Sequence, residues 1–156
     1  MLIALEKVGR LDLLTGCFRL IVVPHEVVRE LDFPPDHRHH AAGRRILEFA
    51  SGQAFDVRSS AAPRLSGLPS SIGPGEADAL SVARSEGLLL LSDDRAARTI
   101  SPHLRIDVSG TLGVVILANH LQLLPADDAR DVIVGLVRTG LRISGDAVAA
   151  ALSRLR

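Results

Sequence analysis

The feature that most constrains the fold is a run of four leucines, Leu88 to Leu91, followed at once by two acids, Asp93 and Asp94. The run comes directly after a helix-like segment that ends at Gly87. Because it is short and continuously apolar, it predicts a short strand buried on both faces. Such strands belong to parallel sheets covered by helices, and ligands bind at the carboxyl ends of their strands. The sequence therefore places Asp93 and Asp94 at a ligand-binding edge.

The rest of the chain repeats this alternation of strand and helix. Apolar and β-branched runs predict strands, and apolar residues at a period of 3.6 predict helices. We expect one α/β domain over residues 1–156, with a three-layer α/β/α arrangement around a central parallel sheet. The predicted strands are 18–24, 54–60, 88–92 and 105–110. The predicted helices are 2–14, 25–31, 41–52, 73–87, 95–104 and 111–124, with two more at 128–141 and 144–156 in a C-terminal part of about 126–156, and residues 59–74 form a long connection.

Composition narrows the class of protein. The apolar runs are too short for a membrane-spanning helix, and no export signal is evident, so we expect a cytoplasmic protein. The single cysteine, Cys17, fits a reducing compartment and a small buried side chain. The net charge is zero and aromatic residues are scarce at 3%, which argues against a base-stacking single-strand binder. Any nucleic acid would be contacted mainly through its backbone.

Two explanations of Asp93 and Asp94 follow from the residues alone. Buried carboxylates need compensation, which a metal ion supplies. Capping of the next helix by Ser92 or Asp93 is the other explanation, with Asp94 favouring the positive end of that helix. The choice between them depends on whether other acids converge there.

Two helices offer such acids. At about 100° per residue, Glu76 lies on the same side of its helix as the apolar residues, whereas Asp78 lies about 200° away on the solvent side. Glu76 at a helix start is also explained by the helix dipole alone. Glu30 lies on the flank of the buried face of the helix 25–31, a weaker signal of the same kind.

The order of these segments resembles the PIN-domain nucleases, in particular the short prokaryotic branch related to VapC-type toxins. The resemblance covers nearly the whole chain. It rests on "LIALEKVGRLDLL", "IVVPHEVVREL", "GPGEADALSVARSEGLLLLSDDRAAR" and "VSGTLGVVILANHLQLL", of which the third is the most specific.

The resemblance implies a set of functional residues. Glu30, Glu76 and Asp94 match the family's metal-binding and catalytic acids, and Asp93 is a substitute or an additional ligand. Ser109 and Thr111 match small hydroxyl residues near that pocket. We further expect Arg95 and Arg98 to line the same rim and bind the phosphate backbone, although surface roles are equally open. The residues involved are catalytic Glu30, Glu76 and Asp94, metal-binding Asp93 with these three, and substrate-binding Ser109, Thr111, Arg95 and Arg98.

One departure from the family concerns the start of the chain. The family begins with a central strand that ends in an acid, and here Met1 stands at the start of the following helix. The first strand and its aspartate are therefore missing from this sequence. A start codon assigned too late, a truncated or degenerate domain, and a domain completed by a partner remain open explanations.

The resemblance implies an endoribonuclease that hydrolyses RNA phosphodiesters by metal-activated water. Oxygen ligands without His or Cys select Mg²⁺ or Mn²⁺. The resemblance further implies a toxin with an antitoxin partner and a homodimer. The alternative is an inactive PIN-like module that acts by binding.

Two other readings are weaker. A phospho-receiver domain needs a lysine after a later strand, and the only lysine, Lys7, lies in the first helix. The run "HRHH", which carries His37, His39 and His40, suggests a metal site, yet neighbours in a loop rarely converge on one ion.

Overall fold

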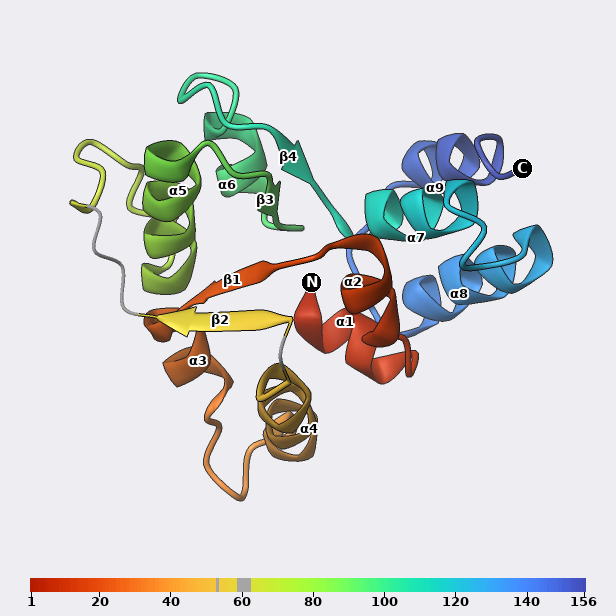
Figure 1. Ribbon diagram of the computed structural model, residues 1–156, viewed down its shortest axis with the longest axis horizontal. Helices are drawn as coiled ribbons and strands as arrows, with labels where there is room; N and C mark the ends of the chain where they lie inside the picture. Colours follow the sequence, from red (N-terminus) through yellow and green to blue (C-terminus); the bar gives the residue numbers. More distant parts are fainter. Residues whose placement is uncertain (53, 59–62) are drawn as a thin grey trace.

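Parallel strand pairs organise the protein, as the computed structural model shows for residues 1–52, 54–58 and 63–156 (Figure 1). Strand β1 (Ile21–Pro24) pairs with β2 (Phe55–Arg58), and β3 (Leu90–Leu91) pairs with β4 (Val108–Ser109). The mixture of helices and parallel strands confirms the predicted α/β class. The helices are α1 (Leu2–Lys7), α2 (Asp12–Cys17), α3 (His25–Leu31), α4 (His40–Ala50), α5 (Pro74–Glu86), α6 (Arg95–Ile100), α7 (Thr111–His120), α8 (Ala126–Arg138) and α9 (Gly145–Leu152).

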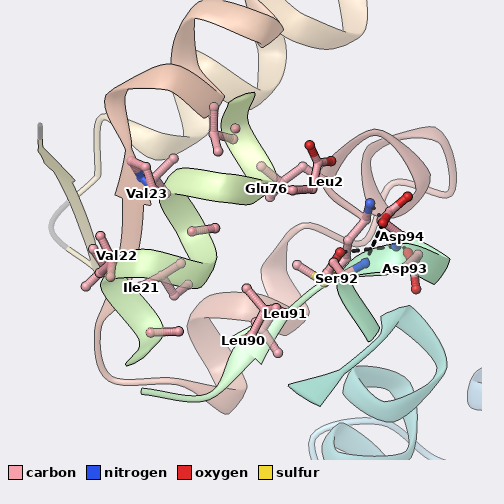
Figure 2. A pocket seen from close by; sticks show the side chains of 18 of the residues that line it. Leu2, Ile21, Val22, Val23, Glu76, Leu90, Leu91, Ser92, Asp93 and Asp94 are labelled. Carbon is pink, nitrogen blue, oxygen red and sulfur yellow. Dashed lines mark hydrogen bonds and ion pairs between the residues drawn. The ribbon is translucent and has the colours of Figure 1, made fainter. Parts of the chain in front are cut away.

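The strands form two pairs instead of the single sheet expected from the sequence. In the described residues, β1 and β3 are edge strands that face each other without being hydrogen-bonded. A cavity of about 710 Å³ lies between them, lined by Val22 and Val23 of β1 and by Leu90 and Leu91 of β3 (Figure 2). No strand of the described chain occupies this cavity.

The leucine run is only half buried. Strand β3 covers Leu90 and Leu91, whereas Leu88 and Leu89 are 37% and 44% exposed. The prediction of a strand buried on both faces was therefore wrong for Leu88 and Leu89. Leu88 and Leu89 are exposed because β3 has a neighbouring strand on one side only within the described residues, and the open cavity lies on the other side.

The first predicted helix, residues 2–14, is two short helices. Helix α1 ends at Lys7, and Gly9 then adopts a left-handed conformation with φ +67°. Arg10 binds Asp12 at the start of α2 through Nε and Oδ1 at 3.0 Å. The apolar period continues across the break, since residues of both helices enter the same core. Periodicity alone could not locate the turn.

Most other elements are shorter than predicted, although α4 begins one residue and α8 two residues before the predicted start. The strand expected at 105–110 is reduced to β4, and the helix expected at 111–124 ends at His120. Part of the predicted strand 54–60 and of the connection 59–74 falls on residues 59–62, which lie outside the described residues.

Two hydrophobic cores stabilise the fold. The larger is built by α1, α2, α7, α8 and α9, which Figure 1 shows gathered around the C-terminal half. Leu5, Leu14 and Ile133 are completely buried in it. The smaller joins α5, β3 and α6 through Leu80, Leu90 and Ala97. None of the described helices has the length and hydropathy of a membrane-spanning segment.

Gly43 controls the packing of α4 against the end of α3. A Cβ on Gly43 would collide with the carbonyl oxygen of Leu31, which is backbone and cannot move aside cheaply. We predict that Gly43→Ala lowers the free energy of unfolding by about 1–3 kcal/mol, the usual cost of overpacking. Urea denaturation measures the change.

Gly145 in α9 is the matched control, because no atom lies within 4 Å of its added Cβ. Gly145→Ala should change the free energy of unfolding by less than about 1 kcal/mol. Equal effects of the two substitutions would contradict the close approach of α4 to Leu31.

Cys17 is partly buried, and its Sγ lies 3.9 Å from the carbonyl oxygen of Val114. Burial, and then the charge of Asp12, raise the pKa of this thiol. The pKa of Cys17 is higher in the folded than in the unfolded state. The contribution of the protonated thiol to the free energy of unfolding is therefore complete below the unfolded-state pKa and is lost as the pH rises through the folded-state pKa. We predict that iodoacetamide alkylates Cys17 more slowly in the folded protein at pH 8 than in urea, as mass spectrometry would show.

Candidate functional site

The carboxyl ends of the strands lead directly into helices. Strand β1 ends at Pro24 and α3 begins at His25, while β4 is separated from α7 only by Gly110. After β3, the residues Ser92, Asp93 and Asp94 make the turn into α6. Because parallel strands end at the same edge, these corners bring segments far apart in sequence to one place.

All four candidate acids line the same cavity between β1 and β3. Glu30 comes from α3, Glu76 from α5, and Asp93 and Asp94 from the corner after β3. Figure 2 shows Glu76, Asp93 and Asp94 on the side of the cavity away from Leu90. An apolar interior thus opens at an acidic mouth.

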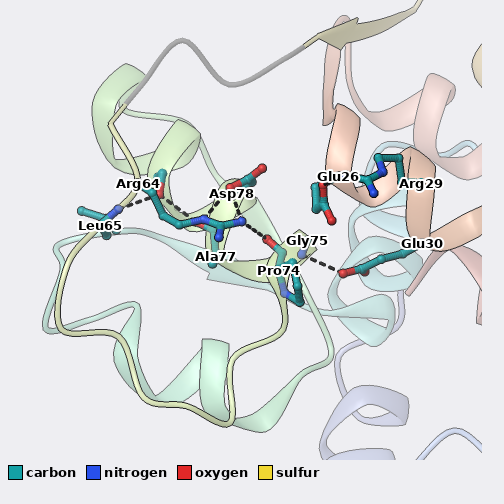
Figure 3. A network of polar contacts seen from close by, with 10 residues as sticks. Glu26, Arg29, Glu30, Arg64, Leu65, Pro74, Gly75, Ala77 and Asp78 are labelled. Carbon is teal, nitrogen blue, oxygen red and sulfur yellow. Dashed lines mark hydrogen bonds and ion pairs between the residues drawn. The ribbon is translucent and has the colours of Figure 1, made fainter.

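Glu30 and Glu76 form one pair of acids. The Oε1 atom of Glu30 accepts a hydrogen bond of 2.8 Å from the N–H of Gly75, at the start of α5 (Figure 3). Both carboxylates reach within 4.0 Å of the position that a Cβ on Gly73 would take. Glu76 also lines the cavity beside Ala79, as its helical position predicted.

Asp78 lies on the other side of α5, as expected, yet it is not simply solvated. Its Oδ1 accepts a hydrogen bond of 3.0 Å from Nε of Arg64, which also contacts the carbonyl oxygen of Pro74 at 3.4 Å (Figure 3). This network fixes the segment before α5 to its outer face, where it leaves the acidic mouth free.

Asp94 caps the helix that follows it. Its Oδ1 accepts a hydrogen bond of 2.7 Å from the N–H of Ala97, in the first turn of α6. Its own N–H donates to Oγ of Ser92 at 3.1 Å. The other carboxylate oxygen, Oδ2, has no hydrogen-bond partner among the described residues, so Asp94 keeps an oxygen for a ligand.

Asp93 holds a different helix. Its Oδ1 accepts the backbone N–H of Thr111 at 2.8 Å and its Oδ2 accepts the Thr111 hydroxyl at 2.5 Å. The amino group of Met1 lies 3.4 Å from the same Oδ2. Of the two explanations weighed from the sequence, Asp93 therefore acts as a cap in this structure, but for α7 and not for α6.

The predicted substrate-binding residues lie at different depths. Thr111 is fully buried, and the hydroxyl of Ser109 packs against Gly113 in α7. Among the described residues, neither belongs to the cavity wall. Their proposed contact with substrate stays a prediction.

The two arginines lie on α6 near the acids. Nη1 of Arg98 contacts the carbonyl oxygen of Ser92 at 3.4 Å, and it stands beside Gly110 opposite Oδ1 of Asp93. Arg95 lines a smaller hollow of about 480 Å³ together with Asp94 and Thr99. Positive charge therefore borders the acids on the α6 side.

The acids are arranged as two pairs, not as one closed cage. Within the part of the chain that the structure describes, no three His, Cys, Asp or Glu side chains are close enough to hold one ion. The donors are the hard oxygens that Mg²⁺ and Mn²⁺ prefer. The residues thus fit such an ion in chemistry, while their spacing fits partial coordination completed by water.

A family model described as a PIN domain (DUF3368) matches residues 1–156. The chain belongs to the PIN-domain family. Neither the curated proteins nor the solved structures contain a match to it. The family is nuclease-like, and the PIN assignment covers every element that carries a candidate acid.

Two glycines lie directly beside the candidate acids and were not singled out from the sequence. A Cβ on Gly75 would stand 2.5 Å from Oε2 of Glu30, and one on Gly110 would stand 2.7 Å from Oδ1 of Asp93. Their positions directly before Glu76 and Thr111 are the signal that could have identified them. Both allow a carboxylate to approach a helix start.

Removal of the Asp93 cap should destabilise the protein. Asp93→Ala leaves the N–H and hydroxyl of the buried Thr111 without their acceptor, so we predict a loss of about 1–3 kcal/mol in the free energy of unfolding. Urea denaturation measures it. The exposed Asp131 on α8 is the control, and Asp131→Ala should cost less than about 0.5 kcal/mol. Equal stability of the two variants would show that Asp93 does not hold α7.

Proposed function

We propose that this PIN domain is a metal-dependent endoribonuclease. The observation that carries the proposal is the convergence of Glu30, Glu76 and Asp94, from three distant segments, on the mouth of one cavity. Carboxylates gathered at one place repel each other, and a bound cation relieves that repulsion. Membership in a nuclease-like family agrees with this chemistry.

The proposed cofactor is Mg²⁺ or Mn²⁺. Glu30 and Glu76 would hold it as a pair, and Asp94, through its unused Oδ2, would reach it through a bridging water, because no three of the described carboxylates are close enough to bind one ion directly. Asp93 would contribute only if its bonds to Thr111 rearranged. When bound, such an ion supplies an activated water and neutralises charge on the scissile phosphate.

The chain's own residues would bind and orient the RNA. Arg98 and Arg95 present guanidinium groups beside the acidic mouth, where they would pair with phosphates on either side of the scissile bond. Asp93 already accepts the N–H of Thr111 at the start of α7, so we place the main phosphate contacts on α6. Contact of Ser109 and Thr111 with the RNA stays a prediction.

The alternative function is a PIN-like module that binds without cleaving. It is favoured by one observation: three of the four acids, Glu30, Asp93 and Asp94, already accept hydrogen bonds at helix starts. Carboxylates used in this way support the fold even if no metal is ever bound. Cleavage assays on variants separate the two functions.

The proposed biological setting is that of a cytoplasmic toxin held by an antitoxin, with the PIN domain forming a homodimer. This setting rests on the family resemblance. Co-expression with the product of a neighbouring small reading frame, followed by light scattering, would test the complex and the dimer.

Cleavage of single-stranded RNA with Mg²⁺ or Mn²⁺ is the decisive experiment. We predict that Asp94→Asn and Glu76→Gln each lower the cleavage rate by about 100-fold or more, because each removes a negative charge that would stabilise the bound ion. Asp131→Asn on α8 is the matched control and should keep full activity. Gel electrophoresis of end-labelled RNA measures the rates.

Full activity in the Asp94→Asn variant would remove Asp94 from the site. Absence of cleavage on RNAs of varied sequence would favour the binding module. The same assay on a chain extended by in-frame residues upstream of Met1 would test whether a strand between β1 and β3 is needed for activity.

A further inference from the structure

A group of aromatic rings lies on the loop between α3 and α4. The rings of Phe33 and His37 are stacked, with centroids 4.4 Å apart and planes inclined by 10°. His39 stands 5.8 Å from Phe33 and 5.4 Å from His37. We call these three rings the aromatic platform. The scarcity of aromatic residues argues against base stacking from the sequence alone, but the fold gathers one of the four phenylalanines and two imidazoles at this one place.

The platform is held in shape by its own loop. The backbone N–H of His39 donates to Nδ1 of His37 at 3.2 Å, and the ring of His40 contacts the carbonyl oxygen of Phe33 through Nδ1 at 2.7 Å. The N–H of His37 donates to the carbonyl oxygen of Pro34 at 2.9 Å. The rings are thus ordered before any ligand arrives, which lowers the entropic cost of binding.

Core packing explains only part of this arrangement. Phe33 packs against Gly43 of α4 and reaches the wall of the cavity that Glu30 also lines. His37, by contrast, is exposed and His39 is partly exposed, so their rings are not buried in the core. The exposed ring of His37 and the accessible part of His39 remain available for a planar ligand.

Two basic side chains stand near the platform, whose loop also carries the exposed acids Asp32 and Asp36. Arg38 and Lys7 are exposed and lie close enough to His39 to lower the pKa of its imidazole, after desolvation, which is the larger cause. The lowered pKa favours the neutral imidazole, which suits stacking. Arg38 and Lys7 provide the charge that phosphates require.

We propose that the aromatic platform stacks an unpaired base of the RNA and that Arg38 and Lys7 bind its backbone, so that the strand runs past Phe33 to the acidic mouth. The proposal rests on the proposed ribonuclease function and specifies that the substrate is single-stranded. Stacking on flat side chains tolerates every base but requires that the base be unpaired. A duplex cannot offer such a base.

The experiment measures RNA binding without cleavage. Fluorescence anisotropy in EDTA compares a labelled 12-nucleotide single-stranded RNA with the same strand annealed into a blunt duplex. We expect the variant His37→Ala/His39→Ala to bind the single strand about tenfold more weakly, the order of loss for one stacked base, and the duplex with less than a twofold change. His103→Ala, an exposed histidine on another loop, is the control and should bind as the unmodified protein does.

A second variant separates stacking from charge. His37→Phe/His39→Phe keeps flat rings without ionisable groups, so it should restore most of the affinity and leave the salt dependence of binding unchanged. The platform would be overturned by any of four results. The alanine variant binds single-stranded RNA as tightly as the unmodified protein, or it loses as much affinity for the duplex as for the single strand. The phenylalanine variant restores no affinity, or the unmodified protein does not bind single-stranded RNA.

Failure of the platform is distinguishable from failure of the ribonuclease. Cleavage with Mg²⁺ or Mn²⁺, and its loss in Asp94→Asn, test the acids alone. If the unmodified protein cleaves RNA and the alanine variant binds single-stranded RNA with unchanged affinity, the nuclease function stands and the platform is wrong. If this loop binds peptides more tightly than RNA, both the platform and its proposed ligand are wrong.

Discussion

The double hydrogen bond between Asp93 and Thr111 is the interaction on which the rest of the structure depends. Asp93 ends the segment of β3, which belongs to the smaller hydrophobic core, and Thr111 begins α7, which belongs to the larger one. The strand pairs themselves are not hydrogen-bonded to each other in the described chain. A polar corner therefore reinforces the junction of the two cores at β3, where Leu90 belongs to the smaller core and Leu91 packs against the larger one, and charge-assisted bonds are strong enough for that role.

The same chemistry serves stability and function at the acidic mouth. Glu30 and Asp94 each use one oxygen to satisfy the N–H groups at a helix start, which a helix cannot satisfy itself. A carboxylate has two oxygens and about four acceptor positions, so a cap retains capacity for a cation. Capping and metal binding are therefore compatible roles of one side chain.

The cavity between β1 and β3 is the second physical constraint. In a parallel ladder, alternate residues direct their backbone groups to opposite sides, and Leu90 and Ser92 bond toward β4. Leu91 consequently directs its N–H and carbonyl toward the cavity. With exposed Leu88 and Leu89 beside it, the cavity is bordered by an apolar strand edge, and the four acids line its mouth.

The sequence by itself determined the class of fold, the order of nearly all elements and the family, because apolar periods of two and 3.6 residues survive without tertiary information. It also determined that Glu76, and not Asp78, faces the cavity, because a helix holds side chains at known angles. Only the tertiary structure decided the split of the sheet, the break at Gly9 and the partner of Asp93. These features depend on which strand edges and helix starts meet in space. Asp93, for example, is hydrogen-bonded by Thr111, which lies 18 positions away in the sequence.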